Sequence, residues 1–143
     1  KELALHEIVS VGEKLPMIEK LVTQERIERY AAAAGDFNPI HIDPVFAASS
    51  QFGCTIAHGM MIAATLSESL SQAFKRSWPD GGRLKIRFKS PVFPGDTVAT
   101  FGEVKKNHTR DGIREVICSV GVRKQTGEVV ITGEATILVT SAA

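Results

Sequence analysis

Residues 57–74, which read AHGMMIAATLSESLSQAF, decide the fold. On a helix, apolar side chains would surround most of this segment, and Glu68 is its single charged residue. A helix that is apolar nearly all round is buried inside a protein. The sequence therefore predicts one long central helix enclosed by other elements. Its apolar members are Met60, Met61, Ile62, Ala63, Ala64, Leu66, Leu70, Ala73 and Phe74.

The second half of the chain supplies a sheet that can enclose this helix. Residues 83–89 alternate between cations and apolar residues, which is typical of a half-buried strand. Longer β-rich segments follow, and strands joined by tight turns form an antiparallel meander. The segments are 97–107, 114–124 and 129–140, and the turns lie at 78–82, 94–96, 110–112 and 125–128. A sheet with one apolar face and a buried helix pack together, so the predicted class is α+β.

The first half of the chain predicts two further helices around a polar loop. Thr23 resembles the N-cap of a helix that ends at Gly35, where a left-handed residue is needed. A short helix is predicted from Asp43-Pro44 to about Ser50, with proline in its first position. The apolar stripe of the first helix comprises Ile27, Tyr30, Ala31 and Ala34.

The composition is that of an ordinary globular domain, predicted to span residues 1–143. Hydrophobic residues make up 43% and charged residues 23%, which excludes a disordered protein. The 17 basic and 16 acidic residues give a net charge of +1, so no overall field attracts nucleic acid or an anionic membrane. No apolar run approaches the ~18 residues of a membrane span, and no signal peptide is evident. Two cysteines form no disulfide framework, so a cytoplasmic protein is expected.

The polar segment before the central helix carries the first candidates for chemistry. Asp36 and His41 are five residues apart, and Pro39 lets the chain bend so that both side chains reach one side. A carboxylate and an imidazole that converge can hold one water molecule and remove its proton. The alternative is structural: Asp36 caps a turn and His41 hydrogen-bonds a backbone carbonyl. Asn38 is expected to shape the loop through an Asx turn.

The start of the central helix carries the second group of candidates. The first N–H groups of a helix lack intrahelical partners and carry positive partial charge, and Gly59 would let a ligand approach them. Such an N–H can form an oxyanion hole for a carbonyl that becomes an enolate. Alternatively, Gly59 only permits tight packing. His58 could line the site or belong to the helix cap, and Ser67 could support the site or bond back to a carbonyl one turn earlier.

Other kinds of chemistry have weaker signals. No His-Glu-x-x-His pattern or cysteine pair indicates a metal site. Cys54 lacks the signature of a nucleophile, and no glycine-rich nucleotide loop occurs, so neither metal nor cofactor is expected. The alternating strand presents a cationic face, which is either a landing surface for the phosphates of a thioester carrier or a solvated sheet face. Its members are Arg83, Lys85, Arg87 and Lys89.

Taken together, these motifs resemble a known family. The run YAAAAGDFNPIH at residues 30–41, then Phe46-Ala47, Phe52-Gly53 and IAHGM at residues 56–60, is similar to the MaoC-like or (R)-specific enoyl-CoA hydratases. The resemblance covers nearly the whole chain, because the order helix, loop, buried helix and meander also fits. It implies the hot dog fold, a long helix wrapped by an antiparallel sheet. It also implies a homodimer with active sites near the subunit interface.

The resemblance further implies an activity, the reversible hydration of trans-2-enoyl-CoA to (R)-3-hydroxyacyl-CoA. Asp36 would then be the base for the attacking water. His41 would hold that water and help deliver a proton to the α-carbon, and the Gly59 N–H would stabilise the enolate oxygen. Ser67 matches a family position that supports the water or the histidine. Residues 51–55 are expected to shape the acyl pocket.

Several alternatives share the fold and stay open from the sequence. A 3-hydroxyacyl dehydratase acting on acyl carrier protein, or a hydratase of branched or dicarboxylic enoyl-CoA, would use the same pair. A hot dog thioesterase and a non-catalytic partner subunit that shapes an acyl tunnel are further options. The expected partner in every enzymatic case is an acyl thioester, on CoA or on acyl carrier protein.

Overall fold

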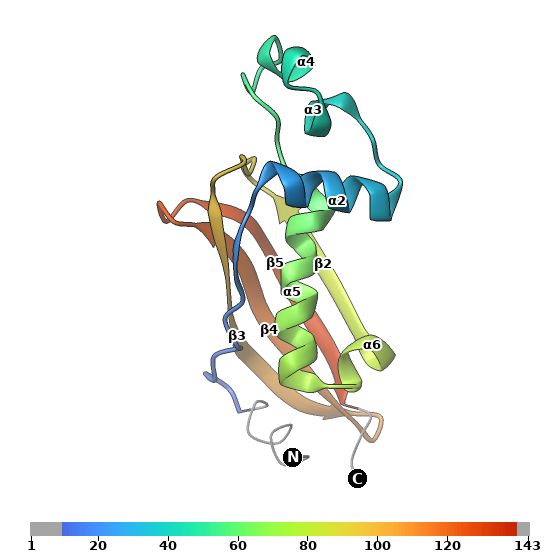
Figure 1. Ribbon diagram of the computed structural model, residues 1–143. Helices are drawn as coiled ribbons and strands as arrows, with labels where there is room; N and C mark the ends of the chain where they lie inside the picture. The colour runs from blue at the N-terminus through green and yellow to red at the C-terminus, as the bar shows by residue number, and fades with distance from the viewer. Residues whose placement is uncertain (1–9, 140–143) are drawn as a thin grey trace.

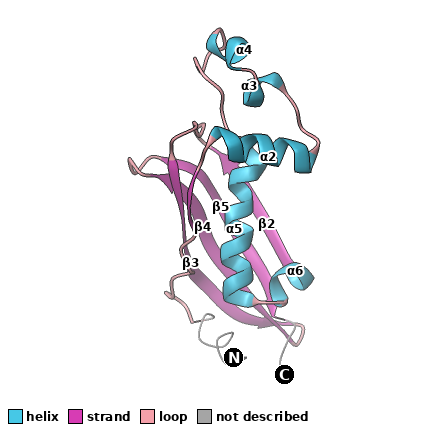
Figure 2. Ribbon diagram, viewed as in Figure 1, coloured by secondary structure: helices cyan, strands magenta, loops and turns pink. Residues whose placement is uncertain are grey.

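The computed structural model describes residues 10–139 as a curved antiparallel sheet packed around one long helix (Figures 1 and 2). The sheet has five strands in the order β1-β3-β4-β5-β2. The strands are β1 (Glu19–Leu21), β2 (Gly82–Phe88), β3 (Thr97–Arg110), β4 (Ile113–Lys124) and β5 (Val129–Val139). The helices are α2 (Gln24–Ala34), α3 (Pro39–Ile42), α4 (Pro44–Ala48), α5 (Gly59–Phe74) and α6 (Ser77–Gly81). The predicted α+β class and the helix-in-sheet arrangement are confirmed.

The core lies between α5 and the concave face of the sheet. Leu66, Leu70 and Phe74 of α5 are fully buried there. Alternate residues of β4 meet them from the sheet, because side chains one residue apart on a strand point to opposite faces. The predicted inward set on β4 is confirmed: Val116, Cys118, Val120 and Val122 are all buried.

Local signals place several element boundaries correctly. The Thr23 side chain accepts a hydrogen bond from the Arg26 N–H at 3.1 Å, and Gly35 ends α2 with a left-handed φ of 71°. The β3–β4 turn places Asp111 and Gly112 at φ of 53° and 78°. Positive φ at both central residues is the requirement of a type I′ hairpin turn, so the predicted hairpin is confirmed.

Other predictions about the elements are wrong in detail. The central helix begins at Gly59 rather than at residue 57, and its side with Met60 and Ala64 is exposed, so this chain does not enclose it all round. Residues 77–81 form the short helix α6 instead of a simple turn. The predicted helix from Asp43-Pro44 ends at Ala48, and α3 precedes it. Ala34, placed in the apolar stripe of α2, is exposed.

Helices α2, α3 and α4 lie across and beyond the N-terminal end of α5 (Figure 1). The segment that carries Asp36 and His41 is therefore held close to the first turn of α5. Between residues 10 and 139, no helix combines the length and the apolar character that crossing a membrane would require.

An ion pair between half-buried Asp96 and buried Lys124 fixes the turn that follows β2. The Asp96 carboxylate accepts hydrogen bonds from the Phe93 N–H at 2.8 Å, and Lys124 Nζ lies 3.1 Å away. In the same turn, the carbonyl oxygen of Val92 accepts the Ala57 N–H at 2.8 Å. The ion pair therefore supports a turn that contacts the chain just before α5.

Candidate active site

The loop after α2 presents Asp36 at the surface. The Asp36 N–H donates to the Ala31 carbonyl at 3.0 Å, which closes the end of the helix. Its carboxylate Oδ1 accepts the Asn38 N–H at 3.3 Å, and Asn38 Oδ1 accepts the Ile40 N–H at 3.1 Å. Asn38 is thus the N-cap of α3, and its predicted role in shaping the loop is confirmed. This short helix carries His41 toward Asp36.

His41 is half-buried and has a defined tautomer. Its Nδ1 lies 2.8 Å from the carbonyl oxygen of Ile56. A carbonyl can only accept, so Nδ1 carries the proton, and Nε2 offers a lone pair in the neutral ring. The expectation that His41 satisfies a backbone carbonyl therefore holds for one nitrogen and leaves the other for chemistry.

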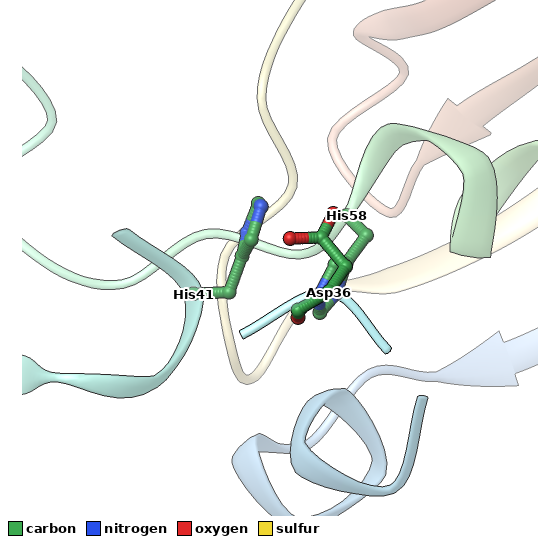
Figure 3. Close-up of side chains that lie close together, drawn as sticks. All are labelled: Asp36, His41 and His58. Atoms are coloured by element: carbon green, nitrogen blue, oxygen red, sulfur yellow. The ribbon is translucent and has the colours of Figure 1, made fainter. Parts of the chain in front are cut away.

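Asp36, His41 and His58 form one cluster, drawn in Figure 3. A ligand atom of each residue lies within 4.8 Å of the others. The Asp36 carboxylate points toward the His41 ring in this view. Two hydrogen bonds of about 2.8 Å to a shared water would span such a gap. The predicted convergence of Asp36 and His41 is therefore observed.

His58 contacts both other members of the cluster. Its side chain is only 2% exposed, and its Nε2 lies 3.0 Å from the carbonyl oxygen of Asp36, to which it must donate. Its ring stacks on His41 with centroids 3.8 Å apart and is tilted against Tyr30 at 4.8 Å. His58 stands at the N-cap of α5 but makes no side-chain cap bond. Its observed contacts hold Asp36 and His41.

Gly59 begins α5 beside this cluster. The Met61 and Ile62 N–H groups both donate to the His58 carbonyl, whereas the hydrogen bonds of residues 10–139 include no protein acceptor for the Gly59 N–H. Its φ is not positive, so glycine is not required there by backbone conformation. A Cβ at this position would lie 2.8 Å from Cε1 of Phe88. The lack of space reflects tight packing against Phe88, as the structural alternative expects, while the free N–H leaves a donor for a ligand.

A cavity of about 290 Å³ opens next to Gly59. Its walls are mainly apolar and include Phe52, Ile62 and Phe88. Phe52 comes from the segment expected to shape the acyl pocket. Sequence reasoning missed that Phe88 covers Gly59, since alternation identifies the face of a strand but not what lies opposite it.

The four cations of residues 83–89 do not converge on this cavity. Only Lys89, which follows β2, lines it. Arg83 lines a different cavity together with Arg110 and Glu115. Six residues of extended strand span about 20 Å, so one compact ligand group cannot contact both ends.

Ser67 lies apart from the cluster. It stands two turns beyond Gly59 and is half-buried. Within residues 10–139, Ser67 forms no hydrogen bond with Asp36 or His41. Thr65 is the residue that bonds back within α5, with its hydroxyl 2.6 Å from the Ile62 carbonyl.

The cluster has the residue types of a metal site but not the geometry of one. His41 Nδ1 and His58 Nε2 already bond to carbonyl oxygens. A metal ion lies in the plane of each imidazole that binds it, about 2.1 Å from the nitrogen. The two ring planes are 24° from parallel at a centroid distance of 3.8 Å. Planes arranged in this way intersect much farther than 2.1 Å from the nitrogens, so one ion cannot lie in both planes at bonding distance. As arranged, the rings suit proton transfer better than shared coordination.

Comparisons with known proteins identify the family of this chain. The model of the MaoC-like domain matches residues 8–126. The (R)-specific enoyl-CoA hydratase of Aeromonas caviae is 33% identical over 133 residues, which cover 90% of this chain and 94% of that protein. The 3-hydroxybutyryl-CoA dehydratase of Methylorubrum extorquens is 33% identical over 86% of this chain and 76% of its own length.

Solved structures show the same relationship. The (R)-hydratase structure from A. caviae superposes with a TM-score of 0.77 at 32% identity, covering 92% of this chain and 97% of that one. An R-hydratase of Pseudomonas aeruginosa gives a TM-score of 0.79 at 29% identity, covering 92% of this chain and 83% of that one. The match to the family model, the whole-length relatives and the shared hot dog fold establish that this chain belongs to the MaoC-like domain family.

Proposed function

We propose that this protein catalyses the reversible addition of water to a trans-2-enoyl thioester, giving the (R)-3-hydroxyacyl thioester. The observation that carries the proposal is the Asp36–His41 pair, within 4.8 Å, beside a helix-terminal N–H without a protein acceptor. Relatives named as enoyl-CoA hydratase and 3-hydroxybutyryl-CoA dehydratase support the same reaction class.

In the hydration direction, a single water molecule donates one hydrogen bond to Asp36 and its second hydrogen bond to His41 Nε2. Asp36 takes a proton as the water oxygen bonds to the β-carbon of the enoyl group. The electron pair of the double bond shifts toward the thioester oxygen, which the Gly59 N–H stabilises as an enolate. The proton held by Asp36 then passes by way of His41 Nε2 to the α-carbon, which completes the addition and returns both side chains to their starting states. Dehydration is the same path reversed.

The test compares Asp36→Asn with Asp43→Asn. Asp43 lies in the same segment, but its Oδ1 caps α4 by accepting the Val45 N–H at 3.0 Å, and asparagine can keep that bond. Loss of a general base lowers kcat by about 10²- to 10⁴-fold. We expect this loss for Asp36→Asn with crotonyl-CoA and longer enoyl-CoA, and near wild-type turnover for Asp43→Asn. A folded Asp36→Asn protein with full turnover would contradict the proposal, and an inactive wild-type protein would favour the non-catalytic partner subunit.

The cations at residues 83–89 offer a way to test whether the acyl group is carried by CoA or by acyl carrier protein. Lys89 lines the cavity beside Gly59 and can meet a phosphate of either carrier, whereas Arg83 lies at the far end of β2. Lys89→Gln should raise KM several-fold and weaken its salt dependence, because one charge contact is lost. Arg83→Gln is the matched control and should leave KM unchanged for a small CoA substrate. An equal effect of both changes would indicate a diffuse cationic surface suited to a carrier protein.

A homodimer belongs to the same proposal. Among residues 10–139, strand β2 ends the sheet, and no strand of this range pairs with its outer edge. Met60 and Phe88, 61% and 54% exposed, lie at the same end of the molecule and would be covered by a second copy. A dimeric mass in solution, reduced to monomer by Met60→Glu, would support this assembly.

A cytoplasmic location is also proposed, because both cysteines are free thiols, as in a reducing compartment.

A further inference from the structure

A side chain outside the catalytic cluster bridges the two segments that hold His41. Gln24, the first residue of α2, donates from Nε2 to the carbonyl oxygen of His41 at 2.8 Å. Its Oε1 accepts the hydroxyl of Thr55 at 2.7 Å. The orientation of the amide follows from its partners, because the carbonyl can only accept and must face the NH₂ group. Thr55 is 6% exposed, so its hydroxyl is removed from water.

These two hydrogen bonds close a ring of contacts around the imidazole of His41. The His41 Nδ1 bonds to the carbonyl of Ile56, the residue next to Thr55. The Ile56 N–H in turn donates to the Ile40 carbonyl at 3.2 Å. Gln24 thus connects the backbone of His41 with Thr55, which is adjacent to Ile56, the acceptor of the His41 ring. The distance that the Nδ1 bond must span is fixed from both sides.

We propose that Gln24 and Thr55 are positioning residues that hold the His41 ring in its Nδ1–H tautomer, with Nε2 directed at the water site. This inference rests on the proposed function for its kinetic consequence, but not for its structural one. Misplacing a catalytic group by about 1 Å can lower the rate by up to about 10²-fold. A loosened but still bonded ring should lower kcat by about ten-fold, and KM should change less than two-fold.

The test uses Gln24→Met and Thr55→Val, which remove the polar groups with little change in shape. Arg26→Met is the matched control: Arg26 lies on the same helix, and its Nη1 donates to the Leu21 carbonyl at 2.8 Å, away from His41. We expect kcat to fall about ten-fold in both clamp variants and to stay within two-fold of wild type in the control. In a His41→Ala background, Gln24→Met should cause no further loss, because its effect passes through the ring.

Nitrogen-15 NMR of the imidazole rings gives a readout independent of activity. The wild-type His41 ring should show the Nδ1–H tautomer, and Gln24→Met should shift it to a mixture of tautomers. An unchanged tautomer, or a kcat loss no larger than that of Arg26→Met, would overturn the inference. So would an equal further loss in the His41→Ala background. An inactive wild-type protein would contradict only the proposed function, since the NMR comparison still decides whether Gln24 positions the ring.

Discussion

Replacing Gly59 by alanine tests the oxyanion site without deleting its N–H group. The new methyl group would lie 2.8 Å from Cε1 of Phe88, whereas carbon atoms in contact are about 3.5–4.0 Å apart. The ring must therefore move by roughly 0.7 Å or more. Phe88 is 54% exposed, so this movement costs about 1 kcal/mol, the scale of an off-rotamer side chain. Alanine in place of glycine stabilises the middle of a helix by about 0.5–1 kcal/mol and its first position by less, so the folding free energy should fall by no more than about 1 kcal/mol.

Activity should respond much more strongly than stability. Gly59 and Phe88 line the same cavity, so both the methyl group and the displaced ring occupy the space that a thioester carbonyl needs. Loss of an oxyanion donor lowers kcat by about 10²- to 10³-fold, and blocking the approach to the donor should cost about as much, so we expect kcat/KM of Gly59→Ala to fall by about 10²-fold. Enoyl-CoA absorbance measures the rate and urea unfolding the stability. The double variant Gly59→Ala/Phe88→Ala removes the ring and with it the steric conflict, but the methyl group at residue 59 remains, so this variant should stay impaired. Wild-type kcat/KM in Gly59→Ala would refute the assignment of this N–H.

Three further predictions concern stability and thiol chemistry. Burial alone would raise the pKa of Asp96, but hydrogen bonds from a neighbouring amide, a backbone N–H and Lys124 lower it below its usual value. The stabilisation by ionised Asp96 is therefore present above about pH 4 and is lost as the pH falls through the lowered pKa. Asp96→Asn should lower the free energy of unfolding by about 1–3 kcal/mol at pH 7 and by less below pH 4, as measured by urea unfolding. Burial raises the pKa of the Cys118 thiol to about 12, so a thiol reagent at pH 8 should titrate only Cys54 in the native protein and both in denaturant. Leu70→Ala, at a fully buried position of α5, should lower the free energy of unfolding by about 2–5 kcal/mol, and a loss under 1 kcal/mol would place this position outside the core.

Local signals carried most of the fold. Thr23 and Gly35 bound α2 because capping depends on a few neighbouring atoms, and the alternation of residues 83–89 identified β2 because strand faces repeat every two residues. The short helix α6 was missed because its turn-forming residues also complete one helical turn. The exposed side of α5 was missed because composition predicts that a face will be covered but not by which chain.

The candidate site was predictable to the extent that one short segment builds it. Asp36, Asn38 and His41 lie within six residues, and an Asx turn and a proline fix their relation. The acceptor of the His41 ring was not predictable, because it is a backbone oxygen fifteen residues away and carries no residue signature. The separation of the cations followed from strand geometry, once Lys89 and Arg83 were placed at opposite ends of β2.

Ile56 divides two tasks between its main chain and its side chain. Its carbonyl oxygen sets which nitrogen of His41 is protonated, and the residue also lines the cavity beside Gly59. Every amino acid brings the same carbonyl to this position. Substitutions at residue 56 can therefore remodel the space offered to an acyl group while the proton stays on the same nitrogen. Substrate range and acid–base function can diverge here independently, one residue at a time.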